Sequence, residues 1–341
     1  MKLLSGIPLP RTVILQRRYS VAGVSPPYAR VPQSFGPVDL VTFRREAFEP
    51  AKPLVMRPAQ AENAGLTTAL PAATKWLKTR DGSAIFTTHL EKYSALVLPY
   101  ELVVSSTNPL DGPIRQFTDY LLASSDPVQN YLAGFLQAQC RQLSSAPTSG
   151  TRFLRFDAPL ALLMAGFKFN AAAPSSARLK QLYIAQAPLN TLPRELQDDV
   201  PTPSLVKDAG KGDIYDSSVW IGLEPTYTPW HRDPNPNLFH QLWSTKEVRL
   251  LPPRRGEHIF LQAWTKLGNG GTSRIRGAEM MEGAERQVLL DAIWGPDAPG
   301  DILSVDLSPG DALFIPKGWW HSIRSIHGDG GPNASVNWWF R

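Results

Sequence analysis

Short apolar runs bounded by Gly, Pro or Asp follow one another between residues 212 and 341, and they constrain the fold more than any other feature. Runs of this length, with turn residues on both sides, are typical of strands. Proline is abundant, at 32 of 341 residues, which favours short strands and turns over long helices. The pattern predicts a mostly β fold, a double-stranded β-helix or jelly-roll of the cupin type. The expected strands are residues 218–222, 247–251, 258–261, 312–315 and 335–340.

The part of the chain before this region has a mixed pattern, with flanking N-terminal helices. Residues 126–139 carry apolar side chains at helical spacing, and residues 175–186 are expected to enter the barrel as a helix or turn followed by a strand. A further helix is expected at 277–290, inside an insert that contains Gly and charged residues. The expected divisions are a targeting leader and linker at 1–38 and one domain at 39–341, made of an N-terminal part at 39–205 and a barrel core at 206–341.

Two histidines and one aspartate form a candidate metal site. His231 and Asp233 are an H-x-D pair, and on a strand two such side chains point to the same face. His321 follows a strand-like run and a turn. Two imidazoles and one carboxylate leave open positions opposite them on a metal, which suits non-haem Fe(II) and O2. An isolated H-x-D pair arises easily by chance, and a surface turn at Pro234 is the alternative interpretation.

The residues around this pair resemble a known family. The stretches that carry the resemblance lie within 228–253 (TPWHRDPNPNLFHQLWSTKEVRLLPP), 310–321 and 335–340. They resemble the JmjC (cupin-like) 2-oxoglutarate oxygenases, and among these the small hydroxylase branch, which includes the asparaginyl hydroxylase of hypoxia-inducible factor and small arginyl and lysyl hydroxylases. The resemblance runs from about residue 40 to the end of the sequence, with looser echoes such as residues 52–57 in the N-terminal half. It implies a JmjC-type oxygenase domain.

The resemblance also implies roles for individual residues. His231, Asp233 and His321 match the Fe(II) ligands of the family. Lys246 stands where a lysine, on the strand after H-x-D, binds the far carboxylate of 2-oxoglutarate, and Thr228 matches a threonine that assists it. The remaining matches to residues of the cofactor pocket are Asn237, Asn337, the aromatic Trp220 and the cofactor-binding Tyr183.

The chemistry of a dicarboxylate supports the role of Lys246. A carboxylate buried at the end of a narrow barrel needs a cation beside it, because its desolvation is otherwise too costly. Lysine supplies a compact charge with three donors, and a nearby Thr or Tyr hydroxyl adds a hydrogen bond to a charged acceptor. The alternative for Lys246 alone is a solvated lysine on an edge strand.

The function that the resemblance implies is an Fe(II)- and 2-oxoglutarate-dependent dioxygenase. Such an enzyme converts 2-oxoglutarate and O2 to succinate and CO2 while it hydroxylates a C–H bond, here expected on a protein or peptide side chain. A small-molecule or tRNA-modifying oxygenase and a JmjC-type lysine demethylase are alternatives, and hydroxylation is favoured because the motifs match the hydroxylase branch. A catalytically silent cupin-like binding protein and another cupin chemistry, such as an isomerase, are disfavoured by the intact triad and Lys246.

Charge and composition exclude several other classes of protein. The formal net charge is +5, but residues 1–38 hold five basic residues and no acidic one, so the remainder has no net charge and nucleic acid is an unlikely partner. The single cysteine, Cys140, excludes intrachain disulfides and cysteine-based zinc sites. No apolar run is long enough for a membrane span, and the oligomeric state stays open.

The first residues predict mitochondrial import. They are rich in Arg, free of acid and partly apolar, as transit peptides are, and Arg17-Arg18-Tyr19-Ser20 is typical of a processing site with cleavage near Tyr19. The alternative is a basic tail on a cytoplasmic or nuclear protein. We expect a reporter fused after residue 38 to enter the mitochondrial matrix, as fractionation would show. A cytosolic reporter, or mature protein that keeps Met1, would contradict this prediction.

Overall fold

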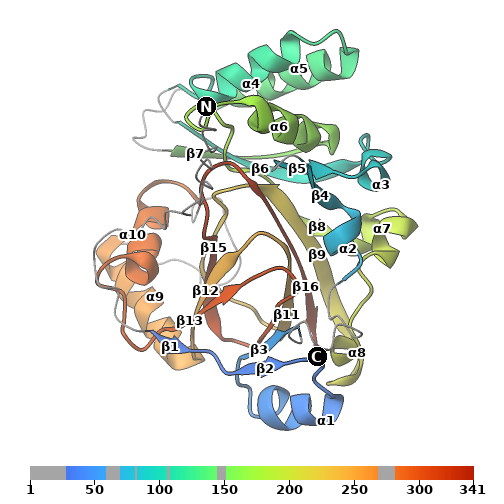
Figure 1. The fold of residues 1–341 in the computed structure, drawn as a ribbon. Helices are drawn as coiled ribbons and strands as arrows, with labels where there is room; N and C mark the ends of the chain where they lie inside the picture. The colour runs from blue at the N-terminus through green and yellow to red at the C-terminus, as the bar shows by residue number, and fades with distance from the viewer. Residues whose placement is uncertain (1–27, 59–69, 81–82, 106–107, 144–150, 268–280) are drawn as a thin grey trace, which may run out of the picture.

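The computed structural model describes residues 28–58, 70–80, 83–105, 108–143, 151–267 and 281–341 (Figure 1). Residues 1–27 of the predicted leader lie outside these ranges, so mitochondrial import stays a prediction. Two short strands fall within the expected linker, and each pairs in parallel with a sheet strand. β1 (Ala29–Arg30) pairs with β13 (Leu303–Leu307), and β2 (Gln33–Phe35) pairs with β3 (Leu54–Arg57). Val31 between them is buried, so this stretch packs on the domain.

Two sheets form the core of the molecule, and they confirm the predicted mostly β, cupin-type fold (Figure 1). Strands β9 to β16 are divided between them, with β10, β12, β13 and β15 in one sheet and β9, β11, β14 and β16 in the other. The five-stranded sheet has the order β1 (Ala29–Arg30), β13 (Leu303–Leu307), β12 (Lys246–Leu251), β15 (Trp320–Ser325), β10 (Tyr227–Arg232). The nine-stranded sheet has the order β2 (Gln33–Phe35), β3 (Leu54–Arg57), β14 (Ala312–Ile315), β11 (Asn237–Trp243), β16 (Pro332–Phe340), β9 (Ile214–Leu223), β8 (Leu182–Pro188), β6 (Val97–Ser105), β7 (Thr151–Pro159).

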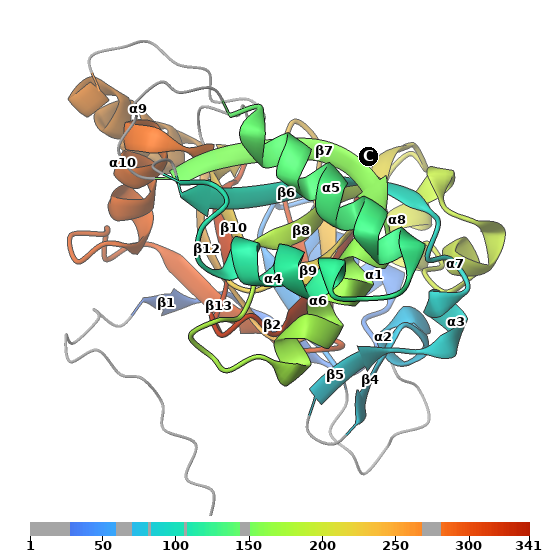
Figure 2. The same ribbon diagram turned by 90° about the horizontal axis from the view of Figure 1, so that it is seen from above.

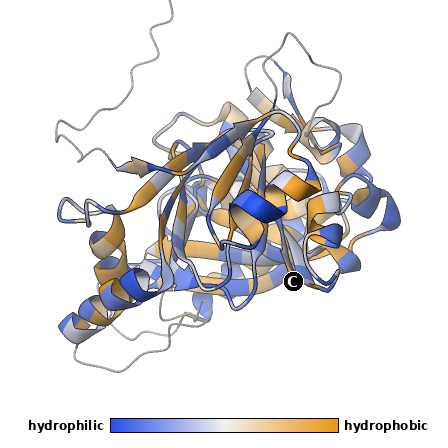
Figure 3. Cartoon of the chain, turned by 90° about the horizontal axis from the view of Figure 1, so that it is seen from below, coloured by the Kyte–Doolittle hydropathy of each residue, from blue (hydrophilic) through white to orange (hydrophobic). Residues whose placement is uncertain are grey.

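Apolar side chains from both sheets meet between them. Val248 and Leu250 on β12 pack with Phe239 on β11 and Leu313 on β14 in one buried cluster. Alternation of side chains along each strand sends these residues inward. Figure 3 shows the hydrophobic residues gathered along the strands and the hydrophilic ones on the outer faces of the helices. Burial of such apolar surface, at about 25 cal/mol per Å², stabilises the barrel.

Helices cover the outer faces of both sheets. α4 (Pro113–Leu122), α5 (Pro127–Arg141) and α6 (Ala161–Ala172) lie over the β6 to β9 end of the nine-stranded sheet (Figure 2). α9 (Pro253–Leu267) and α10 (Gly283–Trp294) pack beside the five-stranded sheet. The shorter elements are α1 (Leu40–Phe43), a π-helix (Arg44–Phe48), α2 (Ala72–Lys75), β4 (Leu77–Arg80), β5 (Ser83–Phe86), α3 (Thr88–Glu91), a 3-10 helix (Leu189–Thr191), α7 (Arg194–Asp198) and α8 (Ser204–Asp208).

Four of the five predicted strands are confirmed, and one is wrong. Residues 258–261 lie in α9, where Ile259 and Phe260 are buried and Leu261 is exposed. Pro253 opens this helix, at a position where its missing N–H costs nothing. A short apolar run has no periodicity that separates a strand from one turn of an amphipathic helix.

The remaining predictions on secondary structure are largely confirmed. The helix predicted at 126–139 is α5, and Asp126 caps it by accepting a hydrogen bond from the Val128 N–H at 2.9 Å. The residues expected at 175–186 end in strand β8. α10 overlaps the helix expected at 277–290, of which residues 277–280 lie outside the described ranges. None of the helices in the described ranges is both long and apolar enough to span a bilayer.

Candidate active site

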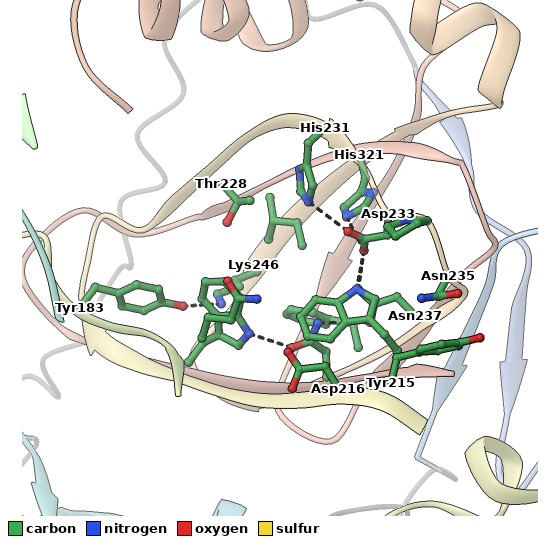
Figure 4. Close-up of a pocket in the computed structure, with 17 residues that line it drawn as sticks. Tyr183, Tyr215, Asp216, Thr228, His231, Asp233, Asn235, Asn237, Lys246 and His321 are labelled. Carbon is green, nitrogen blue, oxygen red and sulfur yellow. Dashed lines mark hydrogen bonds and ion pairs between the residues drawn. The ribbon is translucent and has the colours of Figure 1, made fainter. Parts of the chain in front are cut away.

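The predicted metal triad comes together at one end of the barrel (Figure 4). His231 on β10 pairs directly with His321 on β15, and Asp233 follows the last residue of β10. The distances are 3.8 Å from His231 Nε2 to Asp233 Oδ1 and 3.6 Å from His321 Nε2 to Asp233 Oδ2. One ligand atom from each residue lies within 4.8 Å of the others, which is close enough to bind a single ion.

Backbone carbonyls orient both imidazole rings. His231 Nδ1 lies 2.8 Å from the Pro229 oxygen, and His321 Nδ1 lies 3.1 Å from the Trp319 oxygen. Because a carbonyl only accepts, each Nδ1 carries a proton, and Nε2 is the ring nitrogen left to bind a metal. Two imidazole nitrogens and one carboxylate are the donor set that suits a divalent iron with open positions, so these residues fit Fe(II).

One oxygen of Asp233 is held by two hydrogen bonds. Trp339 Nε1 donates to Oδ2 at 2.7 Å, and Asn237 Nδ2 donates to the same atom at 3.1 Å. Burial raises the pKa of Asp233, but the two histidines and these two donors outweigh it, so the pKa lies below its ordinary value. The carboxylate is therefore ionised and fixed in orientation, as a metal ligand must be.

The hydrogen bonds continue from Asp233 into the cavity wall. Asn237 accepts from Asn337 Nδ2 at 3.4 Å, and Asn337 Oδ1 accepts from Trp220 Nε1 at 2.7 Å. Trp220 and Asn337 come from neighbouring strands β9 and β16. The indole and the two amides thus link the wall of the cavity to the triad.

Lys246 lies buried in the same cavity. Its Nζ donates to the Tyr183 hydroxyl at 3.1 Å and to Ser335 Oγ at 2.8 Å. Burial lowers the pKa of Lys246 to about 7, against the opposing charge of Glu224. The alternative of a solvated edge-strand lysine is wrong, because β12 pairs with β13 on one side and β15 on the other. Lys246 was predicted on the strand that follows the H-x-D pair. It lies instead on the second strand after that pair, β12, because β11 comes between β10 and β12.

All nine residues predicted for the site line one cavity of about 230 Å³. The structure therefore brings together residues up to 154 positions apart in the chain, although the role of each stays a prediction. Thr228 and Trp220 lie on its wall with Tyr183, whose ring centroid is 6.2 Å from that of Trp220. The nine are Tyr183, Trp220, Thr228, His231, Asp233, Asn237, Lys246, His321 and Asn337.

Several further residues belong to the site, and of these the sequence pointed only to Trp339, as a tryptophan expected near the cofactor. Ser335 and Trp339 lie two positions before and after Asn337 on β16, so strand alternation alone places all three on one face. Because every second residue of a strand points to the same face, Asn337 alone could have indicated both Ser335 and Trp339. The other lining residues not predicted are Gln186, Tyr215, Asp216, Pro234, Asn235, Phe239 and Ile323.

Comparison with known proteins agrees with this geometry. The family described as "Cupin-like domain" matches residues 42–341. The chain belongs to this family. Its relatives are JmjC proteins, including lysine-specific demethylase JMJ30 of Arabidopsis thaliana, which is 29% identical over 169 residues covering 48% of this chain and 35% of the relative.

Two other relatives show the same extent of similarity. Jumonji C domain-containing protein 5 of Drosophila melanogaster is 28% identical over 169 residues, 49% of this chain and 38% of the relative. Lysine-specific demethylase 8 of Danio rerio is 27% identical over 161 residues, 46% of this chain and 36% of the relative. The match thus spans little more than a third of the length of each relative.

Replacing Trp339 tests whether its hydrogen bond to Asp233 strengthens metal binding. We expect Trp339→Phe to weaken Fe(II) or Co(II) binding about tenfold to a hundredfold, because loss of a hydrogen bond to a metal ligand typically costs that much. Isothermal titration of the apo protein with Co(II) measures it. Trp338→Phe is a matched control, because that indole is buried and lies outside the cavity lining. Equal metal affinity in wild type and Trp339→Phe would contradict the role of this hydrogen bond.

Proposed function

We propose that the protein is an Fe(II)- and 2-oxoglutarate-dependent dioxygenase that hydroxylates a C–H bond on a protein side chain and releases succinate and CO2. The observation that carries this proposal is one cavity with a metal-binding triad on its wall and a buried lysine inside. A dicarboxylate that also chelates a metal is complementary to both. The membership of the cupin-like family supports the same chemistry.

The side chains of this chain divide the work of the reaction. Lys246, assisted by the hydroxyls of Tyr183 and Ser335, would hold the far carboxylate of 2-oxoglutarate through charge-assisted hydrogen bonds. His231, Asp233 and His321 would hold Fe(II), which supplies O2 activation coupled to decarboxylation of the keto acid when bound.

The cavity wall controls water and orientation. Phe239 and Ile323 present apolar surface beside Lys246, which excludes water and strengthens the charge pair. Asn237, which is bonded to Asp233, and Asn337, which is bonded to Asn237, present amides on the cavity wall, where they would help to position bound oxygens. Thr228 adds a hydroxyl on the β10 wall. Such positioning is the main contribution of protein to cofactor chemistry.

Lysine demethylation is a second candidate, favoured by the names of two relatives, which are lysine-specific demethylases. Demethylation begins with the same hydroxylation, on an N-methyl carbon, and then releases formaldehyde. Formaldehyde release from a methyl-lysine peptide therefore separates the two outcomes. Retention of the added oxygen on the product supports hydroxylation.

Uncoupled turnover of 2-oxoglutarate is the direct test of the proposal. Purified protein is incubated with 2-oxoglutarate and O2, with Fe(II) or with a chelator, and succinate is quantified by mass spectrometry. We expect succinate only with Fe(II). A protein that binds Fe(II) and 2-oxoglutarate yet forms no succinate with any peptide pool would support the catalytically silent binding protein instead.

The low pKa of Lys246 predicts a pH dependence of cofactor binding. With a pKa of about 7 in the free protein, the amine loses its proton above pH 7, whereas the bound dicarboxylate requires the ammonium form. Affinity for 2-oxoglutarate should therefore fall as pH rises above 7, by up to about tenfold per pH unit, because one proton is taken up on binding. Titrations at pH 7 and pH 9 with Zn(II) in the site measure this fall. Lys246→Arg stays charged and should give a flat profile, and a flat wild-type profile would contradict the prediction.

A further inference from the structure

One face of β16 carries a row of polar side chains that follows the barrel from the triad inward. Trp339 donates a hydrogen bond to the aspartate of the triad, and Asn337 donates to the amide beside it. Ser335 accepts a hydrogen bond from Lys246. The next residue on this face is Asn333, because side chains alternate along a strand. The layer of Asn333 therefore lies behind Lys246, on the side away from the metal triad.

A buried carboxylate occupies this layer. Glu224 follows the last residue of β9 and is only 1% exposed. Its Oε1 accepts hydrogen bonds from Asn333 Nδ2 and from Ser244 Oγ, both at 2.8 Å. Residues on the same face of a strand are about 7 Å apart, which is the spacing between the layer of Glu224 and that of Lys246. Glu224 is not among the residues that line the cavity, so a bound cofactor would not touch it.

Both donors to Glu224 lie close in sequence to the lysine site. Ser244 is two residues before Lys246, and Asn333 is two residues before Ser335. Ser244 has a φ of 59°, which is a strained backbone conformation for a residue other than glycine. The hydrogen bond from its hydroxyl to Glu224 helps to hold this turn. The carboxylate thus fixes the start of the strand that carries Lys246 and the strand that carries its acceptor.

A third buried side chain completes the hydrogen bonds of this layer. Gln241 Nε2 donates to Asn333 Oδ1 at 3.1 Å and to the backbone oxygens of Trp243 and Ser244 at 2.6 and 3.1 Å. Gln241 and Asn333 are both fully buried. Hydrogen-bonded polar groups in a dry interior make a core rigid, so the position of Glu224 is well defined.

The titratable groups around Lys246 come from several elements. Tyr183 on β8 accepts a hydrogen bond from its Nζ, and Asp216 on β9 and the triad line the same cavity. Burial lowers the pKa of Lys246 to about 7, and the negative charge of Glu224 opposes this fall. Glu224 is therefore the carboxylate that favours the ammonium form of the lysine.

The surroundings of Glu224 act in both directions on its own charge. Burial raises the pKa of Glu224, whereas the hydrogen bonds from Asn333 and Ser244 lower it. In the loop that follows β15, His327 lowers this pKa and Asp329 raises it. The two donors favour the carboxylate, because an ionised acceptor forms the stronger hydrogen bond. An ammonium group and a carboxylate thus occupy adjacent layers, and each stabilises the charged form of the other.

We propose that Glu224 is a positioning residue of the cofactor site, which keeps Lys246 charged and in place to bind the far carboxylate of 2-oxoglutarate. Glu224 acts from behind the lysine, through its charge and through Ser244 and Asn333. The identity of the bound dicarboxylate rests on the proposed oxygenase function, but the effect of Glu224 on Lys246 can be measured in the free protein.

The protonation of Lys246 in the free protein is the first test. Trace labelling with acetic anhydride modifies only the uncharged amine, so its yield at Lys246 between pH 5 and pH 10, read by peptide mass spectrometry, gives the midpoint of the titration. Glu224→Gln keeps the shape of the side chain and removes its charge. We expect the midpoint to fall by about one pH unit, as loss of an opposite charge about 7 Å away would produce. An unchanged midpoint would overturn the proposal.

The affinity for 2-oxoglutarate at two pH values is the second test. The cofactor is titrated into protein that holds Zn(II), at pH 6 and at pH 8. Glu224→Gln should weaken binding about tenfold at pH 8 but only about twofold at pH 6, where much of Lys246 is still protonated. A merely structural role would weaken binding by the same factor at both values. An equal loss at pH 6 and pH 8, or no loss at either, would overturn the proposal.

Matched variants control for misfolding and for the loss of any buried carboxylate. Asp199→Asn removes a carboxylate that is equally buried but is bonded to Lys75 and Trp76, outside the cavity lining, and it should leave both measurements unchanged. Glu224→Asp keeps the charge and should keep the midpoint near the wild-type value. Thermal melts show which variants are folded. Glu224→Met removes the charge with an apolar side chain of similar size, and it should give the same fall in midpoint where Glu224→Gln does not fold.

The two proposals fail in different ways. Wild-type protein that forms no succinate and does not bind 2-oxoglutarate would reject the oxygenase, while a lower Lys246 midpoint in Glu224→Gln would still support the action of Glu224 on the lysine. Succinate formation by the wild type together with an unchanged midpoint in Glu224→Gln would support the oxygenase and reject the role of Glu224.

Discussion

Replacing any one of His231, Asp233 and His321 with Ala should abolish Fe(II)-dependent conversion of 2-oxoglutarate to succinate. The three ligand atoms lie within 4.8 Å of one another, and removal of one leaves two protein ligands for an ion that needs three. We expect loss of turnover to the background of the iron-free protein. Succinate quantification together with Co(II) titration separates loss of the metal from loss of a later step.

The triad variants need a control for folding and for histidine loss. His258→Ala removes an exposed histidine on α9, away from the cavity, and should keep wild-type turnover. Each triad variant should keep the far-ultraviolet circular dichroism of the wild type, because the barrel core is packed by other side chains. Full turnover by Asp233→Ala would show that this carboxylate is not a ligand.

The triad could be predicted from sequence because most of its information is local. His231 and Asp233 are two positions apart, so a strand alone places them together. The pairing of His231 with His321 depends on the antiparallel register of β10 and β15, which no local pattern specifies. The resemblance of residues 310–321 to a known family supplied that long-range link.

Other parts of the site required the tertiary structure. Tyr215 and Gln186 face the cavity because of bulges, and a bulge is defined by the partner strand rather than by the residue itself. Ser335 is different, since it shares a strand face with Asn337 and strict alternation would have found it. The strand that carries both was predicted from its apolar run rather than from alternation.

The wrong strand at 258–261 has a related cause. Ile259 and Phe260 lie on the buried face of α9 in one cluster with Trp320, and Gly256 permits this approach because a Cβ there would lie 2.3 Å from the indole. This close packing is decided by a residue about 60 positions away, so the short run alone could not distinguish helix from strand. Local patterns thus predicted β9, β12, β14 and β16 of the barrel and the helices α5 and α10, but not the packing that makes residues 258–261 helical.

Lys246→Ala should raise the concentration of 2-oxoglutarate needed for half-maximal binding about a hundredfold or more. Lys246 is buried, and its Nζ is fixed by Tyr183 and Ser335 at 3.1 and 2.8 Å. Loss of one partner of a buried charge pair leaves the other uncompensated, at a cost of about 3–5 kcal/mol. At about 1.4 kcal/mol per tenfold, this corresponds to roughly a hundredfold or more in affinity.

The iron site should respond far less to the same change, because Lys246 is bonded to Tyr183 and Ser335 rather than to the triad. Lys246→Arg should recover only part of the affinity, since a planar guanidinium needs more room than an ammonium between two fixed hydroxyls. Lys317→Ala, an exposed lysine outside the cavity, is the matched control. Titration of 2-oxoglutarate with Zn(II) bound decides the matter. Unchanged affinity in Lys246→Ala would remove the cofactor role of this lysine, and the proposed function would then depend on the metal triad alone.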